Sequence, residues 1–489
     1  MAANDLNPTI PPVISGAPMP PPPPGLSNEL PVSKPPVTSS GGGRKFPKKL
    51  VVVLIVLLLL IGGAFAVIKL VLPQLGLIGL GGKTELTWWG LWEDSSIVQP
   101  LIDEYQADHP NVKIVYQRQS KEDYRERLTN AFAQNSGPDI FRFHNTWTPM
   151  LSKYMSTIPS DVMSAQEYQE TFYPVAANDL SVGGEYVGIP LEYDGLGMFV
   201  NEEIFATFGK RVPDNWIELR DTAIDLTIKD ENGVIKQSGI ALGRTENVDH
   251  WQEILALMMI QNGVDLKKPT GVLAQGALDF FTRFYKTDEV WDETQPPSTI
   301  AFANGKLAMY LAPSWRAFEI DQLNPNLKYR VYPVPQLSKE TEDEPDITYA
   351  SYWVEGVWDK SSNKEQAWDF LKFLSSRENL TKLYANASKT RRFGEPYPRR
   401  DMRDLLVNDS VAGGFIDLAP TAKSWYMASR TFDGDTGMNS RLSSYFEDAI
   451  NAVNDRSSSE AALQTAAIGV QTVLADYGLA QPVPTATPR

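Results

Sequence analysis

The stretch ELTWWGLWED, Glu85–Asp94, carries three tryptophans within five residues and ends in two acids. Its aromatic and β-branched side chains predict a strand that runs to the last tryptophan. Because side chains alternate along a strand, Trp88 and Trp92 share one face while Trp89 points to the other. At least one of the first two should therefore belong to a core, and Trp92, at the end of the strand, is the one expected at the surface.

Short apolar runs and longer amphipathic segments alternate after this strand. SSIVQPLIDEYQADHP (95–110) and YRERLTNAFAQN (124–135) have the period of helices, whereas VKIVYQ (112–117) and PDIFRF (138–143) are typical of strands. The β-α-β-α-β order, with crossovers of this length, predicts an α/β domain built on a parallel sheet. In such sheets, ligands bind beyond the carboxyl ends of the strands.

Polar side chains gather at two of these carboxyl ends. Trp92, Glu93 and Asp94 follow the first strand, and His144 and Asn145 follow another. An indole next to acids and an amide suits a sugar ring, because apolar C–H faces stack on the aromatic ring and hydroxyls donate to carboxylates. Simple packing is the alternative for the tryptophan. The sequence therefore offers this end of the sheet as a candidate carbohydrate site.

Length and charge restrict the class of protein. At 489 residues the chain is long enough for two lobes or more. Residues 84–489 hold 38 basic and 58 acidic residues, a net charge of −20, so no nucleic-acid partner is expected. The absence of cysteine excludes disulfides, thiolate metal sites and an N-terminal lipidated cysteine. Its three histidines lie in unrelated segments, so neither a metal site nor a cofactor is predicted.

The first 72 residues have two different compositions. Residues 1–48 are rich in Pro, Gly and Ser, which predicts a disordered cytoplasmic tail, either a plain spacer or a ligand for SH3- or WW-like domains. Residues 49–72 contain an uncharged, mostly apolar run from Leu50 to Ile68, about the length of a transmembrane helix. A cleaved signal peptide is the alternative, although its apolar core would be shorter and nearer the N-terminus.

The charges around this segment predict its orientation. Basic residues cluster just before it, so the positive-inside tendency places the N-terminus in the cytoplasm and the following domain outside the cell. Residues 73–83 read as a Gly-rich tether. The Pro- and Thr-containing end, 479–489, predicts a second disordered tail.

An ordered series of motifs runs from Thr84 to Gly478. The most specific are YVGIPLEYDGLGMFVNEEIF (186–205) and AFANGKLAMYLAPSW (301–315), and the others that keep the same order are NSGPDIFRFHNTW, VPDNWIEL, YRVYPVPQ, SNKEQAWDFLKFLSS and SWYMAS. The series resembles the family 1 extracellular solute-binding proteins of ABC importers, the group that includes maltose-binding-type proteins. In that resemblance SWYMAS corresponds to the start of a late helix.

The resemblance implies a two-lobe, periplasmic-binding-protein-like type II fold that traps its ligand when the lobes close about a hinge. Lobe 1 is then expected at about 84–175 and 336–393, and lobe 2 at about 176–335 and 394–478. The implied function is capture of a small solute, with a sugar or oligosaccharide as the leading candidate, and delivery to ABC permease subunits. No catalytic residue is implied. The expected form is a monomeric ectodomain, held on the outer face of a bacterial membrane by residues 49–72.

The resemblance also implies ligand-binding residues from both lobes. They are Trp92, Glu93, Asp94, His144, Asn145, Tyr193, Asp194, Trp315, Arg316, Tyr352, Trp353, Trp425 and Tyr426. For Tyr193 and Asp194 a structural turn explains the local sequence equally well. RTFDGDTGMNS (430–440) is acidic, but it lacks the full calcium-loop pattern and is interpreted as a turn.

Two other functions suit the same composition. A surface glycoside hydrolase would use paired carboxylates such as Glu93 and Glu192, although the order of the motifs favours a binding protein. A sensor ectodomain would present a bound solute to a partner through the membrane helix and the tail.

Overall fold

The computed structural model describes residues 83–339, 341 and 343–481. The chain divides into two compact units, residues 1–78 and 79–489, and every described residue belongs to the second. The tail and membrane helix expected in residues 1–72, most of the tether and the last residues of the C-terminal tail lie outside the described residues. No helix among the described ones is long and apolar enough to cross a membrane.

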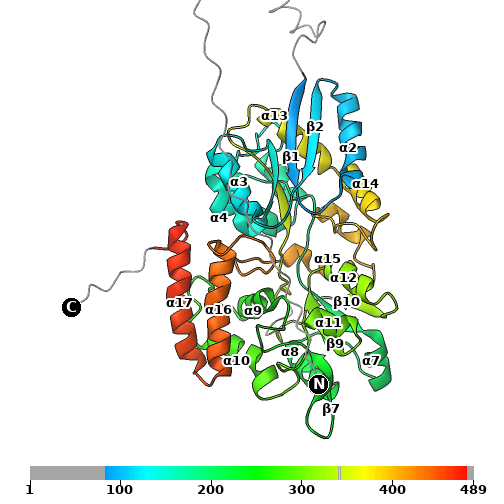
Figure 1. The fold of residues 1–489 in the computed structure, drawn as a ribbon, viewed down its shortest axis with the longest axis vertical. Helices are drawn as coiled ribbons and strands as arrows, with labels where there is room; N and C mark the ends of the chain where they lie inside the picture. Colours follow the sequence, from blue (N-terminus) through cyan, green and yellow to red (C-terminus); the bar gives the residue numbers. More distant parts are fainter. Residues whose placement is uncertain (1–82, 340, 342, 482–489) are drawn as a thin grey trace, which may run out of the picture. The chain divides into compact units, whose positions relative to one another are not determined.

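The first sheet has the strand order β11-β3-β1-β2 (Figure 1). β1 pairs in parallel with β2 and β3, and β11 joins the edge of β3 in the antiparallel direction. The predicted β-α-β-α-β series is confirmed, with α2 and α3 as the crossovers. The elements of this part are β1 (Thr84–Gly90), α2 (Ser95–Asp108), β2 (Val112–Arg118), α3 (Tyr124–Ala133), β3 (Ile140–His144), β11 (Trp353–Val357), α13 (Lys364–Leu374) and α14 (Arg377–Ala387).

Burial along β1 follows the predicted alternation. Trp88 is buried and its Nε1 donates to Glu355 at 3.1 Å, whereas Trp89 is half-buried. Trp92 lies beyond the strand and keeps 36% of its surface exposed. α2 begins at once, because the carboxylate of Asp94 accepts a hydrogen bond from the backbone N–H of Ser96 and caps the helix. This early cap holds Trp92 at the end of the sheet.

The second sheet has the order β10-β6-β9-β8-β7. β8 and β9 are parallel, and the other pairs are antiparallel. Its elements are β6 (Gly197–Asn201), α7 (Glu202–Phe208), α8 (Trp216–Asp225), β7 (Ile228–Lys229), β8 (Ile235–Ile240), α9 (Trp251–Gln261), α10 (Val272–Lys286), α11 (Ser298–Ala303), β9 (Leu307–Ala312), α12 (Arg316–Leu323) and β10 (Tyr329–Tyr332).

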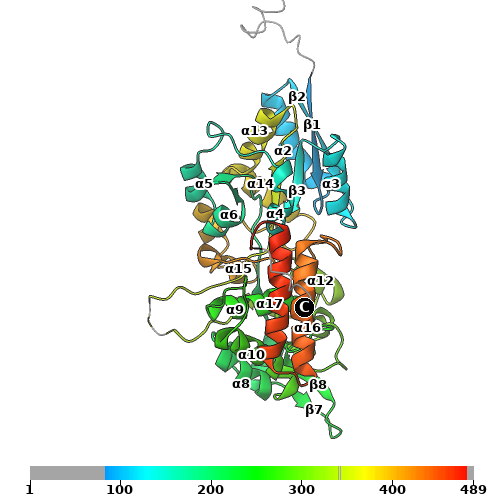
Figure 2. The same ribbon diagram turned by 90° about the vertical axis from the view of Figure 1, so that its left-hand side faces the viewer.

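Shorter elements and two long helices complete the domain. α16 and α17 lie side by side, and both pack on α10 (Figure 2). The remaining elements are η2 (Asn145–Trp147), α4 (Thr148–Leu151), η3 (Ser152–Tyr154), α5 (Ala165–Thr171), α6 (Pro174–Asp179), β4 (Ser181–Val182), β5 (Glu185–Tyr186), η4 (Arg400–Leu405), α15 (Gly413–Ile416), η5 (Ala419–Thr421), α16 (Met438–Asn454) and α17 (Ser459–Asp476).

The late helix begins further along the chain than the resemblance implies. SWYMAS (424–429) was expected to open it, but that segment is not helical and the helix starts at Met438. Arg430 and Phe432 have φ angles of 56° and 55°, which are incompatible with a right-handed helix. The carboxylate of Asp433 then accepts hydrogen bonds from the N–H groups of Asn439 and Ser440, so the acidic turn caps α16. The interpretation of 430–440 as a turn therefore holds for residues 430–437, whereas 438–440 already form the first turn of α16.

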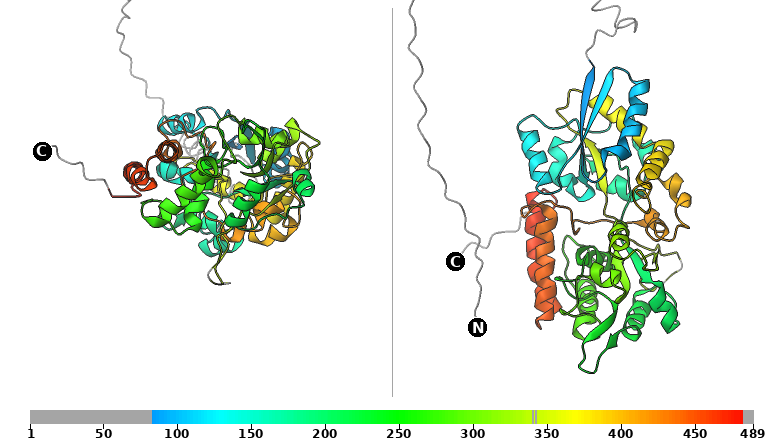
Figure 3. Two further views of the ribbon diagram at one scale, coloured as in Figure 1. Left: turned by 90° about the horizontal axis from the view of Figure 1, so that it is seen from below. Right: turned by 45° about the vertical axis from the view of Figure 1, so that its right-hand side comes forward.

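The two sheets belong to separate lobes (Figure 3), and the chain segments at Leu196, Tyr349 and Lys423 lie side by side where the chain passes between the lobes. The backbone of Tyr349 bridges to Lys423 on one side, and its carbonyl accepts from the N–H of Leu196 at 2.9 Å on the other. A Cβ atom at Gly195 would lie 2.1 Å from that carbonyl, so only glycine permits this approach. These crossings are where a hinge would have to flex; the residue boundaries expected for the lobes remain a prediction.

Candidate functional site

A cavity of about 400 Å³ lies where loops from the two sheets meet, a volume in the range of small-molecule sites. The carboxyl ends of β1 and β3 and the start of the antiparallel strand β11 form one wall. The starts of α9 and α12 form the other. A larger cavity of about 600 Å³ lies between α8, α9, α10 and the segment after β10. Its lining comes from the second lobe and that segment alone, whereas the smaller cavity combines both lobes, as a closing site requires.

Aromatic rings form much of the cavity wall. Trp353 packs edge-on against Trp92 at 5.4 Å between ring centroids, and Trp92 lies 6.0 Å from Phe432. On the opposite wall, Trp315 is covered by the guanidinium of Arg316 at 4.4 Å. These side chains contribute flat apolar surface to the lining of the cavity.

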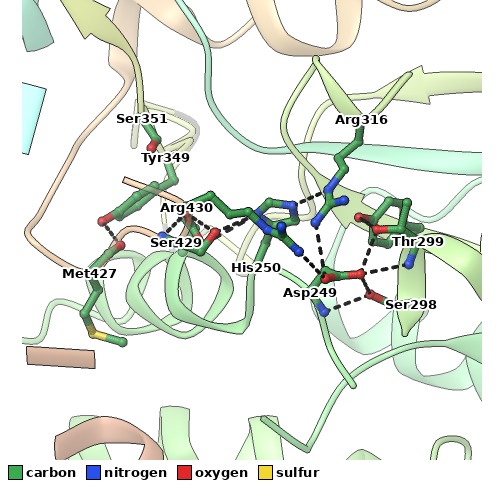
Figure 4. A network of polar contacts seen from close by, with 12 residues as sticks. Asp249, His250, Ser298, Thr299, Arg316, Tyr349, Ser351, Met427, Ser429 and Arg430 are labelled. Atoms are coloured by element: carbon green, nitrogen blue, oxygen red, sulfur yellow. Dashed lines mark hydrogen bonds and ion pairs between the residues drawn. The ribbon is translucent and has the colours of Figure 1, made fainter. Parts of the chain in front are cut away.

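A directed chain of hydrogen bonds lies behind the second wall (Figure 4). Nε of Arg316 donates to Nε2 of His250 at 2.8 Å, so this ring nitrogen carries no proton. Burial, followed by the charge of Arg316, lowers the pKa of His250, and the neutral ring keeps its proton on Nδ1. Nδ1 then donates to Oγ of Ser429 at 2.8 Å, and this hydroxyl donates to Oε1 of Glu253 at 2.9 Å. The donors therefore all point from Arg316 towards Glu253.

Backbone strain gathers at the same cavity. His250, Arg430 and Phe432 all line it, and all have left-handed φ angles, at 64°, 56° and 55°. Non-glycine residues in this conformation cost about 1–3 kcal/mol each and persist where the surrounding structure holds them. Asp249 helps to hold this part of the backbone in place, because its carboxylate pairs with Arg316 at 3.2 Å and with Arg430 at 3.5 Å (Figure 4).

Buried titratable groups also line the cavity. Burial raises the pKa of Asp194 and of Glu253 to about 7, and it raises the pKa of Glu192. Oδ1 of Asp194 accepts from the N–H groups of Gly195 and Ser314, which fixes its orientation. Burial lowers the pKa of His144 to about 3, so its ring is neutral. Burial therefore disfavours the charged forms of these four side chains, which line the cavity together with ion-paired arginines.

Glu253 should make the stability of the protein depend on pH. His250, Arg316, Ser429 and Tyr349 face it, and the net effect is to raise its pKa from 4.5 to about 7. A folded state that holds a proton more tightly than the unfolded chain loses stability as pH rises from about 4.5 to 7. Over this window the free energy of unfolding of wild type, relative to Glu253→Gln, should fall by up to about 3 kcal/mol. Denaturant titrations of both proteins across this pH range measure the difference in their free energies of unfolding. A difference that does not change with pH would contradict the prediction.

Next to the cavity, Arg142 holds a buried cluster of carboxylates. Its Nε donates to Oε1 of Glu355 at 2.7 Å, its Nη1 pairs with Glu93, and Glu192 lies 3.9 Å away. Carboxylate oxygens of Glu93, Glu192 and Glu395 lie within 4.8 Å of one another, a spacing that would admit a cation. Because Arg142 and Arg391 already pair with these carboxylates, the cluster is compensated by the protein itself.

The sequence-predicted site residues fall into three groups. Those that line the cavity are Trp92, His144, Asp194, Trp315, Arg316 and Trp353. Those that line a third cavity, of about 330 Å³, are Asn145, Trp425 and Tyr426. Those that line neither are Glu93, Asp94, Tyr193 and Tyr352.

Four of the residues outside the first cavity have polar partners within the protein, whereas the buried hydroxyl of Tyr193 has none among the described residues. Asp94 caps α2, and Glu93 pairs with Arg142. Asn145 and Tyr352 both donate to the buried carboxylate of Asp179, at 2.8 and 2.9 Å. These contacts occupy the polar atoms that sequence reasoning assigned to a ligand.

Several cavity residues were missed from the sequence: His250, Glu253, Ser351, Arg391, Glu395, Ser429, Arg430 and Phe432. Glu253 could have been noticed, because WQEILALMMIQ is an almost wholly apolar helix with one acid near its start. Burying an ionisable side chain in such a helix is costly unless another group pairs with it, so its presence indicates a specific role. For Arg430 and Phe432, which lie in a turn, local sequence carries no comparable signal.

Comparison with known families identifies the chain. The family described as "Bacterial extracellular solute-binding protein" matches residues 89–380. The chain belongs to this family. The solute-binding protein therefore captures a ligand instead of transforming it, and the hydrolase hypothesis, which needed Glu93 and Glu192 as a catalytic pair, is set aside.

Individual relatives of the solute-binding protein are distant. A binding protein of Brucella abortus is 23% identical over 347 residues, which cover 68% of this chain and 81% of the relative. A maltotriose-binding protein of Pyrococcus abyssi is 21% identical over 301 residues, covering 59% and 61% of the two chains.

The fold of the solute-binding protein is shared with known structures. A cyclic α-maltosyl-1,6-maltose binding protein from Arthrobacter globiformis superposes with a TM-score of 0.65 and 17% identity, covering 81% of this chain and all of that one. The resemblance inferred from the motifs is confirmed at the level of family and two-lobe fold.

Proposed function

We propose that this protein is the substrate-binding component of an ABC importer and that it captures a sugar or oligosaccharide in the 400 Å³ cavity between its lobes. The observation that carries the proposal is the composition of that cavity, which combines aromatic side chains with buried hydrogen-bonding groups. A sugar ring presents apolar C–H faces and a rim of hydroxyls, so it complements both kinds of surface.

Each wall has a distinct role. Trp92 and Trp353 on the first lobe and Trp315 on the second stack on sugar rings from opposite sides. Asp194 and His144 exchange hydrogen bonds with ring hydroxyls. The relatives whose names specify maltotriose and a cyclic maltosyl-maltose support a carbohydrate as the class of ligand.

Capture in this proposal is a closing of the lobes. Ligand binds to one wall first, and closure about the crossing segments adds contacts from the other. The ligand stabilises the closed form by the difference in its affinity for the two forms, and a permease recognises that closed form. The hydrogen bonds among the segments at Leu196, Tyr349 and Lys423 keep the crossing intact while the lobes move.

Residues 49–72, which lie outside the described residues, anchor the protein in the cell membrane in this proposal, with the described domain on the outer face. The uncharged run from Leu50 to Ile68 and the basic residues before it support the anchor and its direction. After cell fractionation the protein should stay with membranes through a high-salt wash, and protease added to intact cells should digest the domain. Release of full-length protein into the medium would contradict the anchor.

Thermal-shift screening of the full-length protein tests the class of ligand. Mono- and oligosaccharides form the test set, and amino acids, polyamines and polyol phosphates are the controls. A ligand at a hundredfold excess over its Kd stabilises the folded state by roughly 2.7 kcal/mol, so a sugar that binds should raise the Tm visibly. A shift with polyamines or amino acids but with no sugar would contradict the proposal.

A further inference from the structure

Glu253, which lines the cavity, has a buried carboxylate oxygen without a hydrogen-bond partner among the described residues. Its side chain is 3% exposed at the start of α9, where it lines the cavity. Oε1 accepts from both the N–H and the hydroxyl of Ser429, at 2.6 and 2.9 Å. Oε2 has no hydrogen-bond partner among the described residues. The directed chain from Arg316 cannot satisfy this oxygen, because it ends on Oε1.

Among the described residues, no lysine or arginine of the cavity wall forms an ion pair with this carboxylate, and the nearby charge of Arg316 only partly offsets the effect of burial on its pKa. Among the described residues, each guanidinium that lines the cavity has another carboxylate as its ion-pair partner. Arg316 pairs with Asp249 and Glu319, Arg430 with Asp249, and Arg391 with Glu395. His250 is neutral, and its Nδ1 lies 3.9 Å from Oε2 of Glu253. The proton on Nδ1 is donated to the hydroxyl of Ser429 and not to Glu253. An ionised Glu253 in the empty cavity is therefore buried and unpaired, which is costly.

The aromatic side chains of the same cavity accept a cation. The ammonium of Lys121 lies 4.9 Å from the ring centroid of Phe432, and the guanidinium of Arg316 covers Trp315. Ring faces attract positive charge through their quadrupole. The net charge of −20 on residues 84–489 also favours cations over anions near the surface.

We propose that the sugar bound in this cavity carries a protonated amine and that Glu253 is the residue that selects it. This rests on the proposed sugar capture and narrows it to an aminated sugar. The ammonium group lies against Oε2 of Glu253 and supplies the missing counter-charge, while the aromatic rings hold the sugar ring. A neutral sugar leaves the carboxylate without that partner, and an acidic sugar adds a like charge beside it.

The test compares two trisaccharides that differ only in the group at C2. Cellotriose and the fully deacetylated β-1,4 glucosamine trimer share one linkage and differ at C2, where a hydroxyl replaces the amine. Calorimetric titration of full-length wild type, Glu253→Gln and Glu447→Gln at pH 7 gives the ratio of the two affinities. Glu447 is a partly buried acid on α16 that does not line the cavity, which makes its variant the matched control.

Wild type and Glu447→Gln should bind the glucosamine trimer at least tenfold more tightly than cellotriose, and Glu253→Gln should reduce that ratio to about one while it still binds cellotriose. If cellotriose or maltotriose binds wild type as tightly as the aminated trimer, this inference is overturned and sugar capture stands. A preference that survives in Glu253→Gln also overturns it, because general attraction to an acidic domain then explains the result. Binding of spermidine, without binding of any sugar, overturns both proposals.

Discussion

Replacing Arg142 by Met is expected to lower the free energy of unfolding by about 3–5 kcal/mol. The substitution keeps most of the side-chain volume but leaves Glu355, which is 0% exposed, and Glu93 without their positive partner. An unpaired buried charge costs more than the ion pair itself contributed, because the carboxylates have already been taken out of water. Urea denaturation of the full-length protein at pH 7 measures the loss.

An exposed ion pair provides the control for Arg142. Lys113 pairs with Glu85 at 2.8 Å, but both side chains are more than half exposed, so Lys113→Met should cost no more than about 1 kcal/mol. The loss in Arg142→Met should also shrink as pH is lowered, because protonation neutralises the carboxylates that it leaves unpaired. A loss as small as that of Lys113→Met would mean that water or a shifted side chain replaces the guanidinium.

Trp315→Ala should weaken the binding of maltotriose by roughly tenfold to a hundredfold, which corresponds to about 1.5–3 kcal/mol. The substitution removes the aromatic surface that the second lobe offers to the cavity, and it uncovers Arg316, which lies over the ring at 4.4 Å. In the proposed capture the ring meets the ligand fully only when the lobes are closed, so the loss should come mainly from faster dissociation. Calorimetry or stopped-flow fluorescence of the full-length protein checks both the affinity and the rate.

Two comparison variants place this effect. Phe208→Ala removes an aromatic ring that is 38% exposed at the end of α7, outside the cavity, and should leave maltotriose affinity within about twofold of wild type. Trp425→Ala alters the cavity of about 330 Å³ that Trp425 lines. If Trp425→Ala weakens binding more than Trp315→Ala does, the sugar lies in that cavity and the assignment of the site is wrong.

The sequence by itself determined the first sheet and its end. The alternation in ELTWWGLW and the helical periods that follow it are local properties, so the β-α-β-α-β series and the exposed position of Trp92 could be read from them. The motif series identified the family for the same reason, since each motif is a short run whose order along the chain is preserved. Helix starts at Asp94, Asn201 and Asn215 follow from side chains that cap their own backbone.

Only the tertiary structure decided which polar side chains remain available to a ligand. The local sequence does not distinguish Glu93 and Asn145 from Asp194 as candidates for ligand binding. In the structure, however, Arg142 pairs with Glu93 and Asp179 accepts a hydrogen bond from Asn145, and both partners come from distant parts of the chain. One carboxylate oxygen of Glu253 is left without a hydrogen-bond partner among the described residues, because a segment 176 residues away brings Ser429 against the other one. Hydrogen bonds and ion pairs act over a few ångströms in space, whatever the separation in sequence, so their allocation is settled only when the lobes and crossing segments are packed.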